Sequence, residues 1–103
     1  MIRIIVHYYT PEDPAAFDAH YAATHIPLTR AMPLLKGFEI SKGEVSTSDP
    51  DKPVYLTAIL SYDSAADMAA SLDSEAGKAA VADVANFATG GVTLITTETE
   101  ELM

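Results

Sequence analysis

Short segments with the residue pattern of β-strands constrain the fold of this chain more than any other feature. Ile2 to Tyr9 is rich in β-branched and aromatic residues, which suit a pleated surface. Apolar side chains alternate along Val54 to Asp63. Leu35 to Val45 and Val92 to Thr97 fit two further strands. The sequence therefore predicts four strands.

A first helix is predicted between the first two strands. Asp13 followed by Pro14 is typical of an N-cap and a first helical residue. We expect this helix to run to about His25 and to stop there, because Pro27 disfavours helical geometry at Ile26.

A second helical region is predicted between the third and fourth strands. Ser64 is suited to cap it, with Asp67 at the third helical position. We expect a break near Ser74 and a second helical part that reaches Phe87. Gly90 and the glycine after it then end the helix.

The order of these elements, β-α-β-β-α-β, predicts one domain over residues 1–103 with a ferredoxin-like α+β fold. Two helices would cover one face of a four-stranded antiparallel sheet. The other face would carry Ile5, Tyr55, Ile59 and Ile95, or their alternates. Since no further helix remains to cover it, we expect a homodimer, in which two such sheets face each other and close a barrel-like core.

Composition and charge exclude several classes of protein. An apolar content of 49% supports a folded core, and a net charge of −9 argues against nucleic acid or anionic membranes as partners. Cysteine is absent, so no disulfide, thiolate nucleophile or cysteine metal site is expected. The apolar start is too short for a signal peptide and no segment reaches the length of a membrane span, so we expect a cytoplasmic protein.

The first helix carries two of the three histidines. With α-helical spacing, Phe17, Tyr21, Thr24 and Leu28 face the sheet, and the histidines lie on the two flanks of this stripe. His20 and His25 would then stand about 140° apart. Because a metal needs imidazoles that converge, we expect no metal site within this helix. A site completed by His7 from the first strand stays open as an alternative.

The same helix is part of a wider resemblance that spans nearly the whole chain. The matching residues are Tyr8, then Phe17, His20, Tyr21, His25, Pro27 and Leu28, and then Ser74 to Gly77 and Asp83 to Gly91. With these residues the chain resembles the ethyl tert-butyl ether degradation (EthD) family of the dimeric α+β barrel superfamily. The resemblance implies a dimer with a small pocket between helices and sheet in each subunit. His7 and Tyr9 depart from the family pattern.

His25 is the candidate catalytic residue. An imidazole titrates near pH ~6.5, which suits a general acid or base, and the alternative is a cap on the last helical carbonyls. We expect Tyr8, Tyr21, Leu28 and Asn86 to bind the substrate. For Asn86 and its neighbour Asp83, the alternative is a solvated helix face.

Three functions are compatible with these residues. The first is a small enzyme of the EthD type, a reductase, oxygenase or isomerase without cofactor, which acts on an apolar or aromatic metabolite that carries oxygen. The second is an accessory protein of an oxygenase or degradation system, and the third is a non-catalytic dimer that binds a small ligand or nothing. The first predicts an apolar cavity of ordinary ligand size with His25 at its wall, whereas the third predicts a packed helix–sheet interface and an inert His25. A haem contact through His25 is a further alternative.

Overall fold

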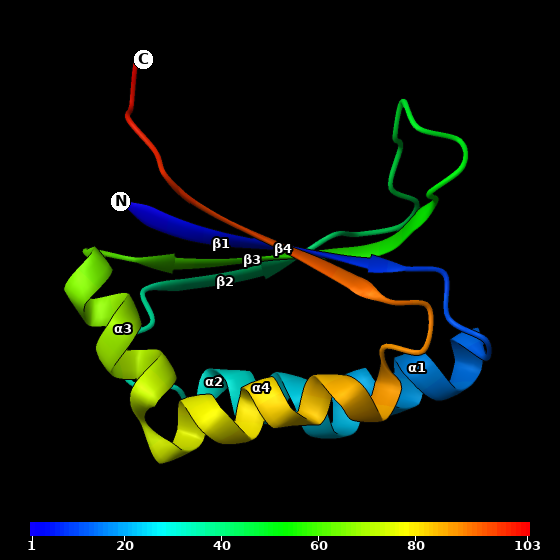
Figure 1. Cartoon of the computed structure of the whole chain (residues 1–103), viewed down its shortest axis with the longest axis horizontal. Coiled ribbons are helices and arrows are strands. Elements are labelled where there is room, and N and C mark those ends of the chain that lie inside the picture. The colour runs from blue at the N-terminus through cyan, green and yellow to red at the C-terminus, as the bar shows by residue number, and fades with distance from the viewer.

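The computed structural model describes all 103 residues and consists of two layers (Figure 1). One layer is a four-stranded sheet in the order β2-β3-β1-β4, in which all neighbouring strands are antiparallel. Its strands are β1 (Ile2–Tyr9), β2 (Gly37–Ile40), β3 (Val54–Tyr62) and β4 (Val92–Glu98). This is the predicted ferredoxin-like topology.

The other layer holds all the helices, which lie together on one side of the sheet in Figure 1. They are α1 (Pro14–His20), the π-helical segment η1 (Tyr21–His25), α2 (Ile26–Arg30), α3 (Ala65–Asp73) and α4 (Glu75–Phe87). No helix of the chain has both the length and the apolar character needed to cross a membrane.

The two predicted caps, Asp13 and Ser64, are present, and Ser74 at the predicted break adds a third. The Asp13 side chain accepts the N–H of Ala16, and Ser64 accepts the N–H of Asp67. Ser74 ends α3 with an extended backbone, and its hydroxyl caps α4 by accepting the N–H of the third residue of that helix. Each hydroxyl or carboxylate accepts a hydrogen bond from a backbone N–H that has no partner within the first turn of the helix. These helix boundaries therefore follow from local chemistry.

The prediction that the first helix ends at His25 is wrong. The helix widens into η1, where the N–H of Ile26 bonds to the carbonyl of Tyr21, and it then continues as α2 to Arg30. Pro27 lies in the first turn of α2, where the lack of an N–H costs little hydrogen bonding. The proline is therefore accommodated by the π-helical turn rather than ending the helix.

This wider turn also changes which side chains face the sheet. Phe17 and Tyr21 are buried as predicted, but Thr24 is exposed and Leu28 is only half-buried. His25 and Thr29 face the sheet in place of Thr24 and Leu28, and they are 5% and 3% exposed. One extra residue in the turn shifts the inward stripe by one position, and so turns His25 toward the sheet.

The core fills the space between sheet and helices. From β1 it takes the side chains of Ile2, Ile4, Val6 and Tyr8, whose alternation matches the predicted apolar face. From the helices it takes Phe17, Tyr21 and Phe87, and from β3 Ala58 and Tyr62. Their rings form a connected cluster, with centroids 5.2 to 5.6 Å apart among Phe17, Tyr21 and Phe87.

The opposite face of the sheet has no helix over it (Figure 1). Ile5 lies in its middle, paired with Ile59 on one side and with Ile95 on the other. Ile95 is 43% exposed. Polar pairs flank this row, among them His7, whose Nδ1 lies 3.1 Å from the hydroxyl of Thr57.

Tyr55 does not lie on this open face, contrary to the prediction. Tyr8 pairs with Leu56 and Tyr9 with Val54, so Tyr55 is the extra residue of a bulge. Its ring packs against Phe17 at 5.1 Å, and its hydroxyl turns toward α1.

The second strand is also shorter than predicted. Strand β2 ends at Ile40 instead of Val45, and Gly43 adopts a φ of 76°. The chain leaves the sheet in this region, and residues 41–53 form the loop to β3.

Candidate functional site

An apolar cavity of about 70 Å³ lies between the sheet and the helices, and 13 of its 15 lining residues are hydrophobic. The two others are His25 and Thr29. Tyr8 and Tyr21 add phenol rings to the wall. The lining, with few polar groups among apolar ones, is that of a small-molecule site, but the prediction of an ordinary ligand-sized volume is wrong, because such sites are several times larger.

His25 reaches this cavity because of the π-helical turn. Its Nδ1 lies 3.0 Å from Oδ2 of Asp83 on α4. Its ring also packs on Phe87, with the centroids 4.7 Å apart. Both contacts fix the ring, while Nε2 forms no hydrogen bond within the chain.

His20 contacts the same carboxylate from the outer side. Its Nε2 lies 2.9 Å from Oδ1 and 3.1 Å from Oδ2 of Asp83. The prediction that the two imidazoles diverge is therefore wrong, because residues five apart come closer together in a π-helical turn than in an α-helix. They converge on a carboxylate, and no group of three or more His, Asp or Glu side chains in the structure is placed to hold a metal ion.

Asp83 is buried, with 6% of its surface exposed. Besides the two histidines, the amide of Asn86 donates to its Oδ1 at 2.9 Å. Burial alone would raise the pKa of Asp83, but the hydrogen bonds from Asn86, His20 and His25 outweigh it and hold this pKa below its ordinary value. Asp83 is thus an anion at neutral pH, and the alternative of a solvated helix face does not hold for it.

Burial lowers the pKa of His25, and the hydrogen bond and charge of Asp83 offset part of this effect. The ring is therefore neutral at pH 7. A carboxylate can only accept, so Nδ1 of His25 carries the proton and donates it to Asp83. Nε2 then keeps a lone pair and is free to accept a proton.

The two tyrosines at the cavity are neutral phenols. Burial raises the pKa of Tyr8 to about 12 and that of Tyr21 well above its ordinary value. Their rings meet edge to face, with centroids 5.7 Å apart. The hydroxyl of Tyr21 is fully buried and lies near that of Tyr8, but it makes no hydrogen bond of ordinary geometry. A buried polar group without a partner is costly, so this hydroxyl is a vacant donor at an otherwise apolar site.

The predicted site residues are only partly brought together. Tyr8, Tyr21 and His25 line one cavity. Leu28 is half-buried and does not line it, and Asn86 is exposed and bonds to Asp83 instead.

Sequence reasoning missed Asp83 as part of this site. On α4 it lies between Ala80 and Phe87, both of which are buried. A carboxylate in the apolar stripe of a helix becomes buried and needs a polar partner. The position of Asp83 in this stripe was the signal that could have identified it.

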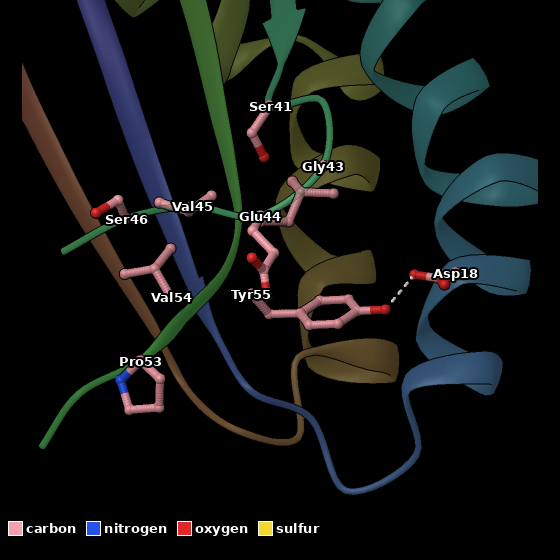
Figure 2. Close-up of a pocket in the computed structure, with 10 residues that line it drawn as sticks. Asp18, Ser41, Gly43, Glu44, Val45, Ser46, Pro53, Val54 and Tyr55 are labelled. Carbon is pink, nitrogen blue, oxygen red and sulfur yellow. Dashed lines mark hydrogen bonds between the residues drawn. The ribbon is translucent and has the colours of Figure 1, made fainter. Parts of the chain in front are cut away.

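A larger hollow of about 920 Å³ opens between the loop 41–53 and α1, away from the histidines. Figure 2 shows Tyr55 crossing it, and its hydroxyl donates to Asp18 at 2.8 Å. Ser41 and Glu44 border the same space. This hollow holds no imidazole and no buried polar atom without a partner, so the smaller cavity has the stronger chemical case.

Comparison with known proteins gives the family. The EthD domain matches residues 10–91. The chain belongs to the EthD family. It is 40% identical, over its whole length and 99% of the relative, to a Rhodococcus erythropolis protein described as an uncharacterized 11.0 kDa protein in the thcB-thcC intergenic region.

Solved structures agree with this assignment. A crystal structure of an EthD family protein from Bacillus halodurans shares 32% identity and a TM-score of 0.85, with 97% of this chain and 99% of that one covered. A dimeric ferredoxin-like protein of unknown function from Thermobifida fusca shares 16% identity and a TM-score of 0.69, with 95% and 90% covered. The latter likeness supports the fold alone.

Proposed function

We propose that this EthD protein is a small enzyme that binds an apolar or aromatic, oxygen-bearing molecule in the helix–sheet cavity and uses His25 as general acid/base. The observation that carries the proposal is the buried hydroxyl of Tyr21, which lies near that of Tyr8 without a hydrogen bond of ordinary geometry. An oxygen atom on a ligand would supply such a bond. The apolar wall would hold the rest of the molecule.

The residues suit the removal of a proton from a carbon or oxygen of the ligand. Nε2 of His25 accepts the proton, and Asp83 stabilises the imidazolium that forms. The phenols of Tyr8 and Tyr21 donate to the ligand oxygen on which negative charge develops. The resulting enolate-type anion is a starting point for isomerisation, by return of the proton to another atom, or for oxidation by molecular oxygen, to which the anion itself supplies the electrons.

In this proposal, ligands enter the cavity through an opening between α4 and β4. Val81 and Leu94 both line the cavity, yet they are 58% and 59% exposed. They therefore form its mouth. The small volume of about 70 Å³ favours a ligand that places only its reactive end beside His25.

A homodimer belongs to the same proposal. The uncovered isoleucine row of the open face, with Ile95 43% exposed, supports sheet-to-sheet pairing. The Thermobifida fusca protein of the same fold is described as dimeric. We also expect a cytoplasmic protein that binds no nucleic acid.

A non-catalytic or accessory protein that binds a small ligand is the second candidate. The small cavity volume favours it, because side chains fill most of the space between the layers. In this candidate, His25 would contact the ligand but would not transfer protons.

The test compares two probes of similar size and shape, phenol and toluene. Both are titrated into ¹⁵N-labelled protein and followed by backbone NMR shifts. We expect phenol to bind several-fold more tightly than toluene, and Tyr21→Phe to abolish this difference. Equal binding of the two probes by the wild-type protein, or no binding, would contradict the proposed site.

A further inference from the structure

Asp83 lies between two imidazoles that have different surroundings. The side chain of His25 is 7% exposed and lines the cavity, whereas that of His20 is 31% exposed. His20 borders a separate surface hollow together with Glu12 and Asp13. One buried carboxylate thus connects an interior imidazole with an imidazole at the surface.

The carboxylate is held in place by three donors. His20 and His25 share its Oδ2, at 3.1 and 3.0 Å, and His20 and Asn86 share its Oδ1, at 2.9 Å each. A group fixed this firmly also fixes the ring that it contacts. It selects the tautomer of His25 that leaves Nε2 toward the cavity.

The charge of His20 acts on the same carboxylate. Protonation of His20 neutralises part of the field of Asp83 and places a second positive charge near His25. Both effects oppose a proton on His25. The other titratable groups that face this cluster are the phenols of Tyr8 and Tyr21, whose pKa burial raises, and the carboxylates of Glu12 and Asp13 at the outer hollow.

We propose that Asp83 and His20 are positioning residues for His25: Asp83 directs its basic Nε2 at the cavity, and the protonation of His20 at the surface tunes its proton affinity. This inference rests on the proposed role of His25 as acid/base. It adds a control of that base from outside the cavity, through two residues that do not line it.

The test uses imidazole ¹⁵N shifts of the full-length labelled protein between pH 5 and 8, without any ligand. The chain has three histidines, so single variants assign every signal. We expect His25 to show a protonated Nδ1 and an unprotonated Nε2 when it is neutral. We expect His20→Gln, which keeps a donor but removes the titratable charge, to raise the pKa of His25.

Two further variants complete the design. Asp83→Asn keeps the shape but not the charge, and we expect it to remove the single-tautomer signature of His25 and to lower its pKa further. His7→Gln, on the open face of the sheet, is the matched control and should leave His25 unchanged. If Asp83→Asn fails to fold, the wild-type tautomer and His20→Gln decide the question alone.

An Nε2-protonated tautomer of His25 in the wild-type protein would overturn the proposal. So would an unchanged pKa of His25 in His20→Gln. These results do not depend on phenol binding. A failure of phenol to bind, with the expected imidazole shifts, would remove the proposed function and leave the coupling of the histidines intact.

Discussion

The two faces of the sheet are built from the same strands but hold different chemistry. On the covered face, side chains of β1 meet the aromatic rings of the helices and enclose a cavity with one imidazole. On the open face, three isoleucines lie between hydroxyl groups and a second imidazole, that of His7. In the proposed function, the covered face holds a small molecule and the open face binds a second copy of the chain.

The largest difference between the faces should appear in stability. Phe17→Ala removes a ring that is 2% exposed from the centre of the aromatic cluster, and we expect a loss of about 3–5 kcal/mol of unfolding free energy. Thr93→Ala on the open face should change it by less than about 0.5 kcal/mol. Urea unfolding measures both values, and similar losses would contradict the assignment of the core to one face.

Two adjacent residues of β4 point to opposite faces of the sheet and allow the faces to be compared directly. Ile95→Glu places a charge on the isoleucine row, and we expect it to convert the proposed dimer to a monomer in sedimentation experiments. Leu94→Glu is the matched control, because Leu94 lies beside it on the covered face at the cavity mouth. This variant should stay dimeric. A monomeric wild-type protein would refute the role of the open face.

The pH dependence of stability should separate the two faces as well. The pKa of His25 is lowered by folding, so the unfolded chain binds more protons as the pH falls below about 6.5. Stability due to this residue is thus present above that pH and is lost below it, and Asp83 adds a second loss below about pH 4. Urea unfolding between pH 8 and 5 should show a shallower dependence of stability on pH for His25→Gln than for the wild-type protein, and an equal dependence would contradict the burial of a neutral His25.

The smallest expected change in stability comes from the removal of a buried hydroxyl, which can be compared at two tyrosines. Tyr21→Phe removes a hydroxyl without a partner, so we expect it to leave stability unchanged or to raise it by about 1 kcal/mol. Tyr62→Phe removes a hydroxyl that bonds to Ser71 at 2.9 Å, and it should cost about 1–2 kcal/mol. A clear loss of stability in Tyr21→Phe would show that its hydroxyl has an internal partner after all.

Much of the fold could be predicted from the sequence because its signals are local. The alternation in β1 and the capping side chains of Asp13, Ser64 and Ser74 act within a few residues of themselves. The bulge that turns Tyr55 toward α1 depends on the register between strands, so no local pattern indicates it.

The candidate site was less predictable because it depends on one helical turn. The proline that predicted a helix end instead follows a π-helical turn, and this turn decides that His25 and not Thr24 faces the cavity. Asp83 comes from a distant part of the chain, so its contact with both histidines follows from the tertiary packing of α4 against η1.

The central claim is that a ligand binds beside His25 rather than in the larger hollow under the loop 41–53. Intermolecular NOEs between phenol and the labelled protein test it most directly. We predict contacts from the phenol ring protons to His25 and Tyr21. Contacts to Tyr55 and Pro53 instead, with none to His25, would contradict the account.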